Sequence, residues 1–135
     1  AEVMELTEEM NLAENYMFLI KTRFGDDYDF KIIKNVSLED KFVPTGAIQT
    51  LLENIAKHNR AQHGKTIKAT MTIDKDWLTI SNTKSDIKSN QETLGTSLKN
   101  LAYRYTLLSD QKPIIENTAS QFIVKIPIIK LSKES

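Results

Sequence analysis

The chain has 135 residues, of which 40% are hydrophobic and 27% charged, the size and composition of one soluble globular domain. Its 18 basic and 18 acidic residues give no net charge, so the basic excess of a dedicated nucleic-acid-binding protein is missing. No apolar run approaches the ~20 residues that cross a bilayer, and acidic residues occupy the place where a secretory signal would be basic. The absence of cysteine excludes a disulfide framework, a thiolate zinc site and a cysteine nucleophile, and two histidines are too few for a histidine-rich metal centre.

A long helix is predicted over residues 1–24, where apolar side chains recur at spacings of three and four. This stripe consists of Leu6, Met10, Ala13, Met17, Ile20 and Phe24. Leu12, Tyr16 and Leu19 widen it, so we expect the helix to contact more than one partner. Gly25 ends the helix, since glycine is favoured after the last turn. Because the pattern is already under way at Ala1, we expect the sequence to be a piece of a longer protein.

A strand and a second helix are predicted next. Residues 28–36 alternate as a strand does, and residues 37–42 form a polar connection. Pro44 suits the first turn of the second helix, for which Asn59 and Gly64 offer stop signals. Its core-facing positions are Ile48, Leu51, Leu52 and Ile55. At about 100° per residue, the other side carries Thr50, Asn54, Lys57 and Ala61.

Two hairpins are predicted in the rest of the chain. Residues 66–73 alternate between apolar and polar, residues 74–76 turn, and residues 77–82 return. Polar residues 83–94 form a loop, and a third helix follows, with a buried stripe of Leu98, Leu101, Ala102, Tyr105 and Leu108. The second hairpin joins residues 114–117 to residues 121–129, with Phe122, Val124, Ile126 and Ile128 facing inward.

This order of elements predicts an α+β fold, a two-layer α/β sandwich in which a mixed, mostly antiparallel sheet packs against helices. The two hairpin links disfavour a parallel, doubly wound sheet, because parallel strands need long crossover connections.

The segment VPTGAIQTLLENIAKH (residues 43–58) closely resembles the N-box helix of LytS-like sensor histidine kinases, whose pattern is roughly PPLLLQPLVENAIKH. Upstream, ENYMFLIKTRFGDDYDF (residues 14–30) resembles the helix that leads into the ATP-binding domain of this family. Downstream, LGTSLKNLAYRYTLL (residues 94–108) is similar to its second glycine box, and FIVKIPII (residues 122–129) to its terminal strand. The resemblance covers nearly the whole chain and implies the Bergerat ATP-binding fold of the GHKL superfamily.

The resemblance assigns expected roles to the N-box residues. Asn54 matches the family's Mg²⁺ ligand, and an amide oxygen suits a cation that shares oxygen ligands with phosphates. The alternative is an ordinary surface asparagine. Glu53 is expected to act in catalysis by holding the attacking group or a metal-bound water, or else to be a solvated carboxylate. Lys57 would meet phosphate oxygens, while His58 would contact phosphate or the lid, or only pack, and is not the phosphoacceptor.

The first glycine box departs from the family pattern. Asn82 stands where the family has the aspartate that accepts a hydrogen bond from the adenine amino group, and Thr83 and Lys84 replace the first glycine. A neutral acceptor contributes about 0.5–1.5 kcal/mol and a charged one about 1.5–3 kcal/mol, so we expect roughly tenfold weaker binding. In the alternative interpretation, Asn82 is only a turn residue that closes a strand.

The second glycine box is partly kept, since GTSLKN stands where GxGLxN is expected. Gly95, Thr96, Ser97 and Leu98 would approach phosphate at a helix N-terminus, with Ser97 in place of a glycine. Asn100 matches the family's helical asparagine and is expected to contact the nucleotide. Alternatively, Gly95 only separates loop from helix and Asn100 is solvated. The loop at residues 83–94 would be the ATP lid.

The resemblance therefore implies the ATP-binding catalytic domain of a two-component sensor histidine kinase, with ATP and Mg²⁺ as cofactors. The γ-phosphoryl group would go to a histidine on a missing upstream domain. Residues 1–24 would lead in from that dimerisation and phosphoacceptor domain, and residues 25–135 would form the ATP-binding domain. Expected partners are the phosphoacceptor domain of the homodimeric parent and a response regulator, without nucleic acid and without membrane contact by this piece. The parent would be membrane-anchored, with this domain in the cytoplasm.

Two alternatives stay open. A degenerate nucleotide-binding-like domain could serve as a scaffold or regulatory interaction module, which Asn82, Lys84 and Ser97 favour. An unrelated α/β sandwich could also carry the N-box pattern by chance.

Overall fold

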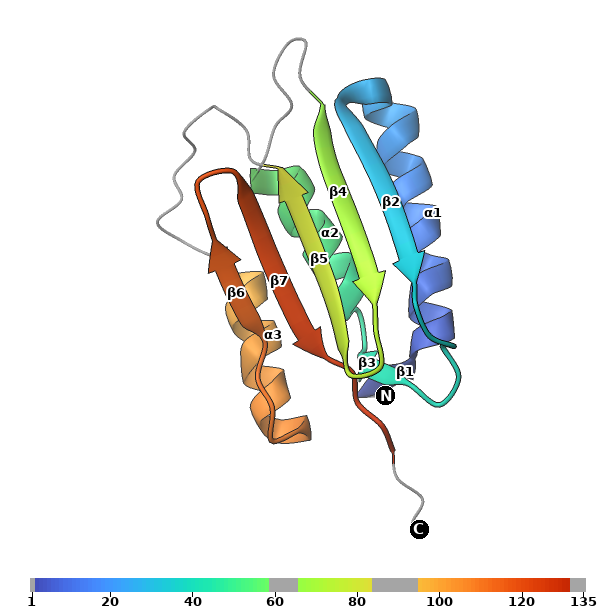
Figure 1. Cartoon of the computed structure of the whole chain (residues 1–135), viewed down its shortest axis with the longest axis vertical. Coiled ribbons are helices and arrows are strands. Elements are labelled where there is room, and N and C mark those ends of the chain that lie inside the picture. The colour runs from blue at the N-terminus through green and yellow to red at the C-terminus, as the bar shows by residue number, and fades with distance from the viewer. Residues whose placement is uncertain (1, 59–65, 84–94, 132–135) are drawn as a thin grey trace.

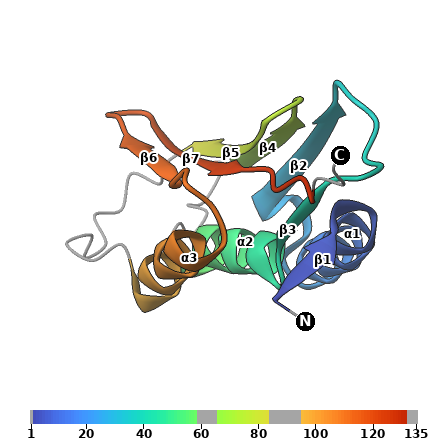
Figure 2. The same cartoon turned by 90° about the horizontal axis from the view of Figure 1, so that it is seen from below.

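The computed structural model describes residues 2–58, 66–83 and 95–131 of the chain. These residues form two layers, with a sheet on one side and three α-helices side by side on the other (Figures 1 and 2). The helices are α1 (Leu6–Phe24), α2 (Ala47–His58) and α3 (Gly95–Leu108). The strands, in sheet order, are β2 (Tyr28–Lys34), β4 (Ile67–Ile73), β5 (Trp77–Thr83), β7 (Gln121–Pro127) and β6 (Ile114–Asn117).

The strand pairing confirms the predicted α+β sandwich with a mixed, mostly antiparallel sheet. β2 and β4 are parallel, with Tyr28 opposite Ile67, because α2 carries the chain across between them. The pairs β4–β5, β5–β7 and β6–β7 are antiparallel. The two predicted hairpins are β4–β5 and β6–β7. The sheet therefore contains one parallel pair, β2–β4, and from β4 onward its four strands run in alternating directions.

A single core lies between the layers. Buried residues of all three helices and of strands β4, β5 and β7 belong to it. Five of the six predicted stripe residues of α1 are buried, whereas Phe24 is 41% exposed, because α1 ends there and Gly25 turns the chain into the short 3₁₀ helix η1 (Gly25–Asp27). α1 packs against both α2 and β2. Leu12 and Leu19, which widen the sequence stripe, are nevertheless 49% and 62% exposed.

A second, two-stranded sheet was not predicted. β1 (Val3–Glu5) pairs antiparallel with β3 (Phe42–Pro44), so α1 begins only at Leu6. The prediction that Pro44 starts the second helix is wrong: Pro44 lies opposite Val3 at the end of β3, and α2 begins at Ala47. Proline is tolerated in an edge strand because no ladder hydrogen bond is needed from its nitrogen.

Three predicted strand ends shift by one or two residues. β2 ends at Lys34 and β7 at Pro127, two residues before the predicted ends in each case, while β5 extends through Thr83. Ile128 and Ile129 remain buried beyond β7, and Ile129 forms an isolated bridge to Phe42. Of the loop predicted over residues 83–94, Thr83 belongs to β5, and residues 84–94 lie outside the described residues. Asn59 and Gly64, predicted as helix stops, also lie outside them.

Candidate functional site

Three segments that are far apart in the sequence are directed to one end of the molecule, the upper end in Figure 1. α2 runs toward this end, β5 finishes there, and α3 lies beside α2 with its N-terminal end toward it. The strand register places the end of β5 at the same end of the sheet as the starts of β2 and β4. Asn82 of β5 pairs with Ala69 near the start of β4, and β4 starts level with β2. We call residues 54–58, 82–83 and 95–98 the convergent end.

Asn54 lies on α2 and is only 9% exposed. Among the residues that the structure describes, its carboxamide has no hydrogen-bond partner. A buried polar group without a partner destabilises a fold by about 1–3 kcal/mol. Asn54 is therefore buried and differs from the surface asparagine of the alternative interpretation, and an amide oxygen is a kind of ligand that Mg²⁺ accepts.

Asn82 lies near the end of β5 and is 2% exposed. Its side chain is on the same face of the strand as the buried Leu78 and Ile80, toward the helices. Its Nδ2 donates a 2.9 Å hydrogen bond to the backbone carbonyl of Thr83, and no described donor reaches its Oδ1. Because Asn82 pairs within the sheet, it is not a turn residue, and it offers an acceptor oxygen in the interlayer space.

The Gly95–Leu98 segment forms the first turn of α3. Ser97 therefore has a helical backbone with negative φ, so no left-handed strain arises from the serine that replaces a glycine of the family pattern. Leu98 is 3% exposed and packs into the core, which fixes this turn against the interior. The side chains of Thr96 and Ser97 lie outside what the structure describes.

Glu53 is exposed, on a different side of α2 from Asn54. Its Oε2 accepts a 3.0 Å hydrogen bond from Nε2 of Gln49 on the same helix. Burial of Tyr16 on α1 raises the pKa of its phenol, and the nearby Glu53 carboxylate raises it further. Glu53 thus lies within electrostatic reach of Tyr16, and its side chain is exposed rather than buried beside Asn54.

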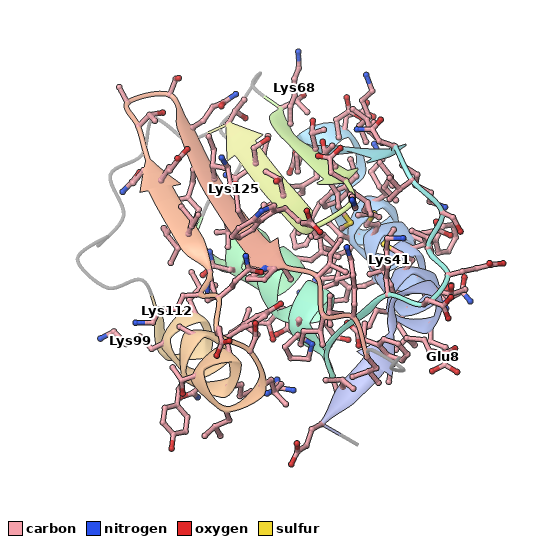
Figure 3. The ribbon with its side chains drawn as sticks, turned by 60° about the horizontal axis from the view of Figure 1, so that its bottom comes forward. Glu8, Lys41, Lys68, Lys99, Lys112 and Lys125 are labelled. Atoms are coloured by element: carbon pink, nitrogen blue, oxygen red, sulfur yellow. The ribbon has the colours of Figure 1, made fainter. Side chains whose placement is uncertain are left out.

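Asn100 is exposed, unlike the buried Asn54 and Asn82. It lies on α3, on the same helical face as Tyr103 and Leu107, which are 64% and 69% exposed. Lys99, labelled in Figure 3, projects into solvent beside it. The fold therefore directs α2, the end of β5 and the start of α3 toward one end of the molecule, where Asn54 and Asn82 are buried, whereas Glu53 and Asn100 are exposed.

The remaining predicted residues of α2 and the predicted lid lie wholly or partly outside the described part of the chain. Lys57 and His58 form the last turn of α2, but their side chains lie outside the described part of the chain. The lid was predicted over residues 83–94; Thr83 is the last residue of β5, and residues 84–94 lie outside the described part. Their roles stay predictions.

The donor set at the convergent end fits a magnesium ion only together with other ligands. Among the described residues, no group of three or more His, Asp or Glu side chains could hold a metal ion. Mg²⁺ is often bound through one or two protein oxygens together with phosphates and water. Asn54 suits that role, because its buried oxygen has no described partner. Of the described helices, none combines the length and the apolarity needed to cross a membrane.

One residue of structural importance was missed. Glu9 of α1 is 2% exposed, and its carboxylate accepts hydrogen bonds from the backbone N–H groups of Gly46 and Ile48 at the start of α2. A signal was present in the sequence, because Glu9 lies three residues after Leu6 and four before Ala13, and therefore on the flank of the apolar stripe.

These features together define a domain with the fold of histidine kinase catalytic domains. The chain is similar to the cytoplasmic segment of the histidine kinase QseC, with a TM-score of 0.66 and 10% identity over 96% of this chain and 78% of that one. It is similar to the nucleotide-free catalytic domain of the histidine kinase ThkA, with a TM-score of 0.57 and 16% identity over 93% and 95% of the two chains. A third similar structure is the Acinetobacter baumannii histidine kinase AdeS, with a TM-score of 0.63 and 12% identity over 97% and 68%.

At the level of sequence, no protein-family model and no curated protein matches the chain. The similarity to the solved structures therefore establishes the fold, and the function has to be argued from the residues of the convergent end.

Proposed function

We propose that this chain is the ATP-binding catalytic domain of a two-component sensor histidine kinase of the LytS-like type. The observation that carries the proposal is the Asn54 carboxamide, which is buried on α2 without a described partner. It lies at the end of the fold toward which β5 and α3 also direct their candidate residues. The fold supports the proposal, because histidine kinase catalytic domains share it.

In this proposal, nucleotide binds at the convergent end. The Oδ1 atom of Asn54 would hold Mg²⁺, which neutralises phosphate charge when bound. The Oδ1 atom of Asn82 would accept a hydrogen bond from the adenine amino group, since its Nδ2 atom already donates to the Thr83 carbonyl. The first turn of α3 would present backbone N–H groups and the positive end of its dipole to the phosphates.

The reaction would be transfer of the γ-phosphoryl group to a histidine of a separate phosphoacceptor domain. Such a reaction asks the protein mainly for positioning and electrostatic stabilisation. Lys57 fits a phosphate-facing role by its place in the last turn of α2. We further propose that α1 leads in from the phosphoacceptor domain, that the parent is a membrane-anchored homodimer with this domain in the cytoplasm, and that a response regulator receives the phosphoryl group.

A second candidate is a scaffold or regulatory module with weakened nucleotide binding. Two observations favour it. The acceptor that we propose for adenine, Asn82, is neutral, and α3 exposes Tyr103 and Leu107 beside Asn100 on one outward face. Exposed aromatic and aliphatic side chains on one helical face suit a protein partner.

Titration calorimetry with ATP and ADP, with and without Mg²⁺, separates the two candidates. The kinase proposal predicts micromolar to high-micromolar binding that is lost without Mg²⁺ and in the Asn54→Ala variant. Asn100→Ala is the matched control, because this exposed amide lies outside the convergent end. Absence of binding at millimolar nucleotide would overturn the kinase proposal and favour the scaffold.

A further inference from the structure

A buried carboxylate of α1 holds the start of α2. Glu9 is 2% exposed, its Oε2 accepts a 2.8 Å hydrogen bond from the Gly46 N–H, and its Oε1 accepts a 3.2 Å hydrogen bond from the Ile48 N–H. The residues joined by these bonds are 37 and 39 positions apart in the sequence. The contact is therefore tertiary, and it fixes α2 to α1 rather than to its own flanking chain.

The start of α2 depends on this outside group. The Thr50 N–H donates the first helical hydrogen bond to the Gly46 carbonyl, so Gly46 occupies the N-cap position. An N-cap residue normally supplies a side-chain oxygen for the N–H two or three positions later, which glycine cannot do. The Glu9 carboxylate supplies that oxygen to Ile48, and its charge also suits the positive end of the helix dipole.

The chain that precedes Glu9 is also bonded to the chain that precedes Gly46. The Thr45 N–H donates to the Glu2 carbonyl at 3.1 Å, and the Leu6 N–H donates to the Lys41 carbonyl at 2.8 Å. β1 and β3 pair between these bonds. Two turns further along α2, Glu53 lies close enough to Tyr16 of α1 to raise the pKa of its phenol. α1 thus holds α2 at its start by hydrogen bonds, and Tyr16 of α1 lies within electrostatic reach of Glu53, the residue before Asn54.

We propose that Glu9 is a positioning residue through which the placement of α1 sets the placement of Asn54. This inference rests on the proposed function, in which Asn54 is the Mg²⁺ ligand and α1 leads in from the phosphoacceptor domain. α2 is a single helix of 12 residues, so a shift imposed on its first turn moves Asn54, two turns on, with it. A change in the position of α1 is thereby transmitted to the nucleotide site.

The rival explanation is a purely local helix cap. Under that explanation, loss of the Glu9 carboxylate loosens only the first turn of α2. Under the coupling that we propose, it loosens the packing of α2 against α1 along the whole helix. The two explanations therefore differ at residues 52–56, beyond the reach of a cap.

Glu9→Gln is the main variant, because it keeps the size of the side chain while removing the charge and placing an NH₂ group against one of the two backbone donors. Glu9→Asp is the second variant, which keeps the charge and withdraws it from α2. Glu8→Gln is the matched control: Glu8 is the preceding residue of α1 and is exposed, as Figure 3 shows.

Amide hydrogen exchange followed by NMR is the primary measurement, without nucleotide. We expect about tenfold faster exchange at residues 52–56 in both Glu9 variants and no change in Glu8→Gln. A change confined to residues 46–48, or none at all, would overturn the inference. If Glu9→Gln does not fold, Glu9→Asp gives the same comparison.

Nucleotide titration forms the second arm. We expect the Mg²⁺-dependent part of the ATP affinity to fall about tenfold in Glu9→Gln and to stay unchanged in Glu8→Gln. If the unmodified chain binds no nucleotide, the proposed function fails, while the exchange measurement still decides whether Glu9 couples α1 to α2. An unchanged affinity in Glu9→Gln, where the unmodified chain binds, would overturn the coupling to Asn54.

Discussion

The phenol of Tyr105 donates a 2.6 Å hydrogen bond to the backbone carbonyl of Pro127, and it fastens α3 to the last residue of β7. Tyr105 is completely buried, and burial raises the pKa of its phenol, so the hydroxyl stays a proton donor at neutral pH. We expect Tyr105→Phe to lower the free energy of unfolding by about 1–3 kcal/mol, because the buried carbonyl loses its partner. Chemical denaturation measures this change.

Tyr103→Phe is the control for that variant. Tyr103 lies on the same helix but is 64% exposed, so removal of its hydroxyl should change the free energy of unfolding by less than about 0.5 kcal/mol. Equal losses in the two variants would show that the bond to Pro127 does not hold α3 in place.

Removal of the Asn54 amide is expected to leave the fold as stable as before or more so. The buried carboxamide has no described partner, and alanine is a better helix former than asparagine. We expect Asn54→Ala to raise the free energy of unfolding by about 0.5–1 kcal/mol, as denaturant titration would record. A loss of more than about 1 kcal/mol would indicate that Asn54 has a structural partner and would weaken its assignment as a ligand.

Gly46 is expected to resist substitution for reasons of backbone conformation. Its φ is 80°, in the left-handed region, while an added Cβ would meet no atom within 4 Å. Gly46→Ala should therefore destabilise the protein by about 1 kcal/mol through strain alone. Gly46→Asn should lose less, because asparagine tolerates this region better. Thermal unfolding of the two variants makes the comparison, and a fully stable alanine variant would contradict it.

The ion pair between Asp76 and Lys130 predicts a pH dependence. The 2.7 Å hydrogen bond from Lys130, with the charges of Lys130 and Lys75, lowers the pKa of Asp76 from its ordinary value of 3.8. Since the folded-state pKa is lowered, the pair stabilises the protein above about pH 4 and loses its effect as the pH falls through the folded-state pKa.

We therefore expect Asp76→Asn to melt slightly below the unmodified chain at pH 7 and to melt together with it at strongly acidic pH. Because the pair is exposed, high salt should also reduce the difference. Thermal melts across this pH range check the prediction, and a difference that grows toward acid would have the wrong sign.

Much of the fold could be predicted from local patterns. The hairpins over residues 66–82 and 114–129 alternate clearly, and the stripes of α1 and α2 recur at helical spacing, so the order of elements and the mixed sheet followed. β1 and β3 could not be found in this way. Each has three residues, and the pairing of Val3 with Pro44 is a tertiary contact that no local pattern encodes.

The candidate site was predicted less completely. The resemblance selected Asn54 and Asn82, and the structure adds that both are buried, which a helical pattern alone did not show for Asn54. Glu53 and Asn100, in contrast, are exposed. The sequence could not show this difference, because a motif gives spacing along the chain but not the direction of each side chain. Glu9 was missed because its partners are backbone groups more than 30 residues away.

The most direct test of the account is a map of nucleotide binding by NMR, with ¹⁵N-labelled protein and MgADP. We predict shifts of the Asn54 and Asn82 side-chain amide signals and of backbone amides at residues 54–58, 82–83 and 95–98. Shifts at the opposite end of the sheet, where Lys41, Lys75 and Lys130 line a hollow, or no shifts at millimolar MgADP, would contradict the account.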